Sequence, residues 1–152
     1  MQGKTPAQLI GMTFGIVYLL VGAVGFAVTG VSNFASDTNT QLIIFDLNPL
    51  HNIVHLAIGA ALLGASASSK IAGPVNGVVG ATYIAVALIG LTGILTFISV
   101  NSGPVPDFFL HLASGLVLIA FIKGASNVGG SANQQDSSMS LYEQNRRAAQ
   151  GG

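Results

Sequence analysis

The sequence predicts an all-α protein, a bundle of four transmembrane helices, on three observations. Hydrophobic residues make up 51% of the 152 residues and charged residues only 7%. Soluble domains carry about 25% charged residues, so this chain could not cover a water-facing surface. Four apolar segments approach or exceed the roughly 20 residues that cross a bilayer core. All five basic residues fall on one side of those segments.

The residues between the apolar segments support their limits. Asn48 before Pro49 has the pattern of an N-cap followed by proline at the first helical position, and Asp107 after Pro106 is interpreted as a second cap. The predicted spans are about residues 7–31, 49–67, 74–100 and 107–122.

The first span also has the pattern of a secretory signal peptide, because Lys4 precedes its apolar run. The apolar region of a signal peptide covers about 7–15 residues. The run from Leu9 to Val31 is longer than that. We therefore expect an uncleaved membrane anchor.

The basic residues orient the spans, because lysine and arginine concentrate in cytoplasmic loops. Lys4 precedes the first span, Lys70 lies between the second and third, and Lys123, Arg146 and Arg147 follow the fourth. The two remaining loops contain no lysine or arginine. Both termini are therefore expected in the cytoplasm.

The chain divides at the end of the fourth span. Residues 1–123 form the predicted transmembrane domain, and residues 124–152 are rich in Ser, Gly, Asn and Gln, a composition typical of a flexible tail. Within this cytoplasmic tail, residues 139–149 could form a short helix that docks on a partner or on anionic lipid.

The second half of the sequence resembles the first. His55 to Gly59 matches His111 to Gly115 at an offset of 56 residues, and Gly15 and Tyr18 match Gly80 and Tyr83 at an offset of 65. These matches predict a duplicated helical hairpin, a 2+2 arrangement whose halves share one orientation. The many glycines are expected to let the helices pack closely.

Ionisable residues inside spans mark functional sites by default. His51 and His55 share one helical face, and so do Asp107 and His111, because each pair is four residues apart. Three imidazoles and a carboxylate could bind zinc or copper. Axial ligation of haem b by His55 and His111, proton transfer, and structural hydrogen bonds to Tyr18, Tyr83 or the loop backbone are the alternatives. Asp46 and Asn52 could join the cluster.

Composition and motifs exclude several other functions. With no cysteine, the chain lacks the ligands for an iron–sulfur cluster or a c-type haem. Five scattered basic residues cannot neutralise a run of phosphates, so we expect no nucleic-acid partner. The sequence contains no pattern of a catalytic nucleophile and its base, so we expect no enzyme.

An apolar segment in the first outer loop is too short to span a membrane. Residues 41–45 are expected to lie on the membrane interface, to cap the outer end of the bundle, or to contact a partner.

The stretch from Asn48 to Gly59 has the pattern N-P-x-H-N-x-x-H-x-x-x-G. With the glycine-rich first span and the two later spans, it resembles a domain-of-unknown-function family of four-helix membrane proteins common in actinobacteria, over about residues 7–123. The resemblance implies a bacterial plasma-membrane location and no established activity.

These features favour a non-enzymatic accessory or scaffold component of a larger bacterial membrane complex, such as a respiratory assembly. Lipid and a protein partner or a second copy of the chain are its expected contacts. A metal, haem b or proton site at the outer ends of the second and fourth spans is one alternative. A small transporter or channel subunit is another.

Overall fold

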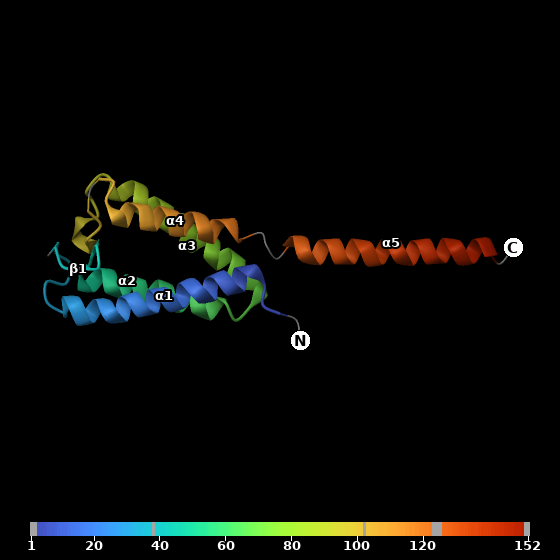
Figure 1. The fold of residues 1–152 in the computed structure, drawn as a ribbon, viewed down its shortest axis with the longest axis horizontal. Helices are drawn as coiled ribbons and strands as arrows, with labels where there is room; N and C mark the ends of the chain where they lie inside the picture. Colours follow the sequence, from blue (N-terminus) through green and yellow to red (C-terminus); the bar gives the residue numbers. More distant parts are fainter. Residues whose placement is uncertain (1–2, 38, 102, 123–125, 151–152) are drawn as a thin grey trace.

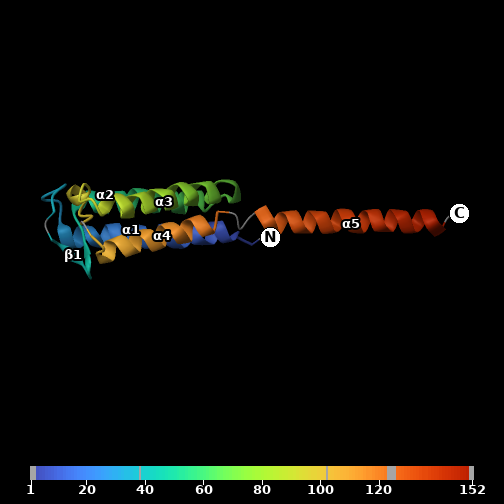
Figure 2. The same ribbon diagram turned by 90° about the horizontal axis from the view of Figure 1, so that it is seen from above.

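Four helices lie side by side in the computed structural model, which describes residues 3–37, 39–101, 103–122 and 126–150. Figure 1 shows helices α1 and α2 beside each other beneath α3 and α4, and Figure 2 shows α2 and α3 in one layer and α1 and α4 in the other. The elements are α1 (Pro6–Thr29), β1 (Gln41–Leu42), β2 (Phe45–Asp46), α2 (Pro49–Ala65), α3 (Ser69–Gly90), a 3-10 helix η1 (Thr96–Ile98), α4 (Pro106–Ala120) and α5 (Ser126–Gln150).

In the described part of the chain, two helices are long and apolar enough to cross a membrane: α1 with 24 residues and α3 with 22. The other two apolar helices are shorter, with 17 residues in α2 and 15 in α4. At 1.5 Å per residue these two are about 25 Å and 22 Å long. The all-helical prediction is confirmed.

Helices α1 and α2 begin at well-formed caps. Thr5 and Gln8 form a capping box at the start of α1, with Pro6 at the first helical position. The side chain of Asn48 accepts a hydrogen bond from the backbone N–H of His51, 2.8 Å away, which confirms the predicted cap of α2. The cap predicted at Asp107 is wrong. Helix α4 begins after Val105, so Asp107 lies in its first turn.

Helix α3 differs from the predicted third span at both ends. It begins at Ser69, five residues before the predicted start at Pro74, because the Ser68 side chain caps it by accepting from the Lys70 backbone N–H. It ends at Gly90 rather than near residue 100. The Thr92 hydroxyl bonds the Ile89 carbonyl, and Gly93 has a left-handed φ of 76°, so the chain leaves the helix there.

Glycines bring the helices of each hairpin into backbone contact. A Cβ atom on Gly15 of α1 would lie 2.9 Å from the carbonyl oxygen of Gly59 on α2. A Cβ on Gly80 of α3 would lie 2.8 Å from the carbonyl oxygen of Gly115 on α4. Gly15 corresponds to Gly80 at the offset of 65 residues, and Gly59 corresponds to Gly115 at the offset of 56. The two helix crossings therefore lie at matching positions of the repeat.

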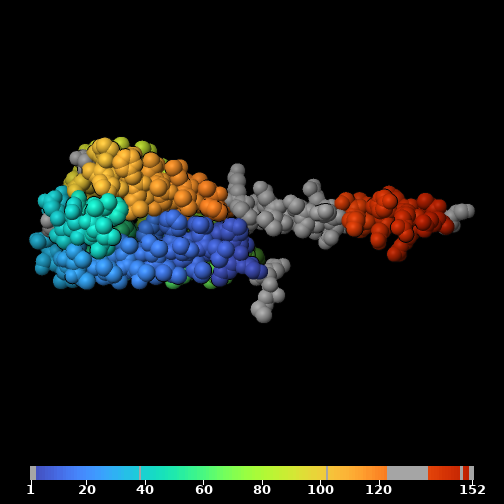
Figure 3. All heavy atoms as spheres, in the orientation of Figure 1, coloured from blue at the N-terminus to red at the C-terminus, as the bar shows by residue number. Residues whose placement is uncertain are grey.

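We call one end of the α1–α4 body the outer end, which carries hairpin β1–β2 and η1. The opposite end is the inner end. In the space-filling view the cyan hairpin region covers this outer end beside α1 (Figure 3). Strand β1 contacts α1, and β2 contacts α4. The hairpin pairs Gln41 with Asp46 and Leu42 with Phe45.

One buried side chain ties three outer segments together. The Asn48 amide donates hydrogen bonds to the carbonyl oxygens of Phe97 at 2.8 Å and Ser36 at 3.2 Å, while its oxygen caps α2. The side chain is fully buried. Asn48 thereby fixes the start of α2 to both outer loops.

Replacing Asn48 with alanine is expected to lower the free energy of unfolding by about 2 kcal/mol, because a cap and two further hydrogen bonds are lost. Asn48→Asp keeps the capping oxygen and loses the donor, so its loss should be smaller. Denaturant titration in detergent, followed by circular dichroism, measures both. Equal stability of Asn48→Ala and the unmodified protein would contradict the role given to Asn48.

Residues beyond α4 include a helix. Figure 1 shows α5 extending away from the α1–α4 body. Residues 139–149, where the sequence predicts a short helix within a flexible tail, lie inside α5, and Met139, Leu141 and Tyr142 are exposed. Lys123 and the predicted domain boundary beside it lie outside the described residues.

Candidate functional site

Three histidines meet at the outer end of the helical body. His51 and His55 come from the first two turns of α2, and His111 from the second turn of α4. Each ring contributes one nitrogen atom, and these three nitrogens all lie within 4.8 Å of one another. The three residues are 2%, 7% and 6% exposed, so they are buried from bulk solvent. This is the spacing of donors that can share one metal ion.

The orientation of His111 is fixed from its own helix. Its Nδ1 lies 2.8 Å from the backbone carbonyl oxygen of Asp107 and 3.4 Å from the Asp107 carboxylate. A proton on Nδ1 can be donated to that carbonyl, which leaves Nε2 with its lone pair free. Metal-binding histidines commonly make such a hydrogen bond through the nitrogen that does not bind the metal.

The two histidines of α2 have nitrogens without hydrogen-bond partners. The buried Nδ1 of His51 has no hydrogen-bond partner. The buried Nδ1 of His55 also has none. Buried polar atoms in folded proteins are nearly always hydrogen-bonded, so two unpaired imidazole nitrogens in one cluster require an explanation.

Two tyrosines complete a closed circuit of five aromatic rings drawn from all four helices. Tyr18 stacks on His55 with ring centroids 5.6 Å apart, and Tyr83 meets His111 edge-on at 5.2 Å. The tyrosines contact each other at 5.2 Å. His51 closes the circuit, 4.5 Å from His55 and 6.0 Å from His111. These contacts hold each imidazole ring in one plane.

A small cavity of about 40 Å³ adjoins the cluster. Its lining includes the three histidines and Tyr83, together with residues from α2, α3, η1 and the segment after η1. Sequence reasoning did not find Ile98 and Val100 in this wall, because they approach the histidines only after the chain turns back beyond Gly90.

The other predicted members of the cluster lie beside the three histidine nitrogens and form other contacts. Asp107 holds His111 rather than joining the three nitrogens. Asp46 accepts a hydrogen bond from the Asn101 amide at 2.7 Å. Asn52 points to α1, where its amide donates to the Thr29 hydroxyl at 2.9 Å. The carboxylates therefore surround the histidine cluster without completing it.

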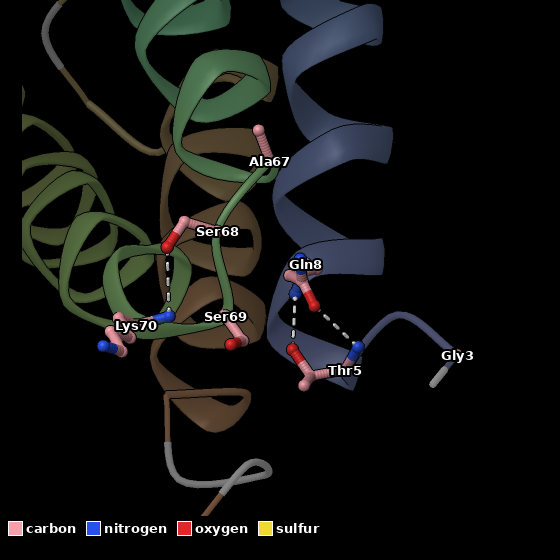
Figure 4. A pocket seen from close by; sticks show the side chains of 7 residues that line it. All are labelled: Gly3, Thr5, Gln8, Ala67, Ser68, Ser69 and Lys70. Carbon is pink, nitrogen blue, oxygen red and sulfur yellow. Dashed lines mark hydrogen bonds between the residues drawn. The ribbon is translucent and has the colours of Figure 1, made fainter. Parts of the chain in front are cut away.

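A larger hollow of about 540 Å³ lies at the inner end, between the start of α1 and the α2–α3 turn. Figure 4 shows its polar side chains engaged with the helix starts, Thr5 with Gln8 and Ser68 with the Lys70 backbone. Gln8 also donates to the Ser66 carbonyl at 3.0 Å. These groups cap helices, so this hollow is not the functional candidate.

Comparison with known proteins identifies a family. A family model described as a domain of unknown function, DUF4383, matches residues 8–123. The predicted resemblance to a family of unknown function is thereby confirmed. No curated protein and no solved structure matches the chain.

Proposed function

The chain belongs to the family DUF4383, a domain of unknown function, and we propose that it binds a zinc or copper ion on His51, His55 and His111. The observation that carries the proposal is the meeting of three buried ring nitrogens within 4.8 Å of one another. Imidazole suits both metals, and three protein ligands leave a fourth position open, as in catalytic rather than structural zinc sites.

The dimensions of the cluster favour an ion over haem b. The adjoining cavity of about 40 Å³ is far below the 300–1,000 Å³ of pockets that hold organic ligands. A proton site needs no cluster of three nitrogens.

Metal content tests the proposal. The full chain, purified in detergent with a histidine-free tag, is incubated with zinc or copper, passed over a desalting column and measured by elemental analysis. We expect one ion per chain for the metal that binds. Less than a tenth of an ion per chain for both metals would overturn the proposal.

We also propose that the protein spans the bacterial plasma membrane four times. Large apolar side chains face outward, with Leu20 59% and Val78 69% exposed, while glycines and polar groups lie inside. Soluble proteins rarely expose large contiguous apolar surfaces, and lipid accepts them. The shorter α2 and α4 span by local bilayer thinning and through their flanking segments.

Matched glycine crossings and paired Tyr–His contacts in the two hairpins support a duplicated 2+2 bundle. In this arrangement Lys4 and Lys70 lie at the inner end, which we place in the cytoplasm together with α5.

Cysteine labelling tests this topology on a background without cysteines. Ser36 lies in the first outer loop and Ser69 at the inner end, and both are exposed. On intact cells, a membrane-impermeant maleimide should label Ser36→Cys and spare Ser69→Cys, which reacts only after lysis. The reverse pattern would refute the orientation.

An accessory or scaffold role in a larger membrane complex is the second candidate. It is favoured by the tip of hairpin β1–β2, where Ile43 is 83% exposed and has a φ of 64°, a strained conformation for a β-branched residue. Its neighbour Ile44 is also exposed. A membrane complex or a second copy of the chain could bury this tip.

Mild-detergent pull-down with mass spectrometry tests the accessory role and should recover such a partner. Recovery of the chain alone as a monomer would count against the role.

A further inference from the structure

The cavity beside the histidines has the size of a very small ligand. Its volume of about 40 Å³ is close to the roughly 30 Å³ that one water molecule takes in the liquid. The three histidines line this space, and three protein ligands leave a fourth coordination position open. It suits a very small molecule rather than an organic substrate of ordinary size.

The walls of the cavity are mainly aliphatic. Besides the histidines, Thr82 and Tyr83, its described lining consists of Val54, Ile58, Val86, Ile98 and Val100. The Thr82 hydroxyl is already engaged, since it donates to the Val78 carbonyl oxygen at 2.9 Å. A zinc-bound water or hydroxide needs hydrogen-bond partners. Among the described lining residues the only other hydroxyl is that of Tyr83, which is buried without a hydrogen-bond partner. The rest of the wall is aliphatic, so it suits a neutral, weakly polar ligand.

Copper is the ion of the proposed pair that binds such ligands. Reduced Cu(I) is stable with three nitrogen donors, and its filled d shell donates electron density into π* orbitals of a diatomic molecule that are empty, as in carbon monoxide, or half-filled, as in dioxygen. Zinc(II) has no tendency to do so.

We propose that the histidine cluster holds Cu(I) and that the aliphatic cavity admits a small neutral diatomic molecule, such as dioxygen, as the fourth ligand. The inference rests on the proposed metal site and deepens it by naming the ligand class. Binding forms one coordinate bond, breaks none, and transfers no proton. Electron density moves from Cu(I) towards the bound molecule within that bond, and no electron leaves the pair.

Carbon monoxide is the probe, because it binds Cu(I) and has an infrared stretch that shifts with isotope. The full chain in detergent is loaded anaerobically with one equivalent of Cu(I) and exposed to carbon monoxide. We expect a single isotope-sensitive band from copper-bound carbon monoxide. Its integrated intensity should correspond to one carbon monoxide molecule per bound copper ion.

Two variants on α3 locate the ligand. Val86→Phe fills the cavity and should remove at least nine-tenths of the band while copper content stays at one per chain. Val78→Phe makes the same change at an exposed position outside the cavity wall and should leave band and copper content unchanged. If Val86→Phe does not retain copper, the presence or absence of the carbon monoxide band in the copper-loaded unmodified protein decides the inference.

The outcomes separate this inference from the metal site. One copper per chain without a carbon monoxide band would overturn the inference and leave the metal site standing. A band of equal intensity in copper-loaded Val86→Phe would place the ligand elsewhere and also overturn it. Absence of bound copper would overturn the inference, and absence of zinc as well would overturn the metal site.

Discussion

Replacing His111 with alanine is expected to lower the affinity of the protein for its metal by more than about 100-fold. Losses of about 10–100-fold follow from removing groups that only position a ligand, so a lost ligand costs more. The same loss is expected for His51→Ala and His55→Ala, since each ring supplies one of the three donor atoms. Competition titration against a chromophoric chelator measures the affinity.

Two further variants make this series specific. Asp107→Asn keeps the backbone carbonyl that holds His111 and removes the carboxylate charge, so we expect a loss of about 10–100-fold. Tyr18→Phe keeps the ring that stacks on His55 and should leave the affinity within a factor of about three. Equal affinity in the unmodified protein and all three histidine variants would show that metal binds elsewhere.

Replacing Gly15 with alanine is expected to disrupt the packing of α1 against α2. Replacing Gly80 with alanine is expected to disrupt the packing of α3 against α4. The added Cβ at Gly15 would lie 2.7 Å from the Leu63 backbone nitrogen, and that at Gly80 2.8 Å from the Gly115 carbonyl oxygen. Backbone atoms cannot move aside as side chains do, so the helices must separate. Overpacking of this kind costs about 3 kcal/mol, and the matched crossings predict similar losses at both positions.

Gly64 provides the control for this pair. It lies inside α2, and an added Cβ there would meet nothing within 4 Å. Gly64→Ala should therefore raise the free energy of unfolding by about 0.5–1 kcal/mol, since alanine favours a helix. Denaturant titration in detergent compares the three variants. Stabilities of Gly15→Ala and Gly80→Ala that equal that of the unmodified protein would contradict the close crossings.

Local rules predicted most of the helices. Asn48 and Pro49 mark the start of α2 because capping depends only on neighbouring residues. The same rules misplaced α3, since Pro74 fits a helix start by sequence but lies within the helix. The end at Gly90 depends on a turn at Gly93 that an uninterrupted apolar run conceals.

The histidine cluster was predictable in part. Helical periodicity pairs His51 with His55, and the repeat points to His111. The same helical spacing placed Asp107 beside His111 and suggested a carboxylate ligand. In the structure Asp107 faces His111 on its own helix, four residues away. Which side chains meet across helices depends on the rotation of each helix, and no local pattern encodes that rotation.

X-ray absorption at the metal edge tests the histidine site most directly. The full chain is loaded with one equivalent of zinc or copper, and the fine structure reports the atoms around the ion. We expect a shell of nitrogen or oxygen ligands with outer-shell scattering from three imidazole rings. A spectrum with one imidazole or none, in a sample that holds one ion per chain, would contradict the proposed site.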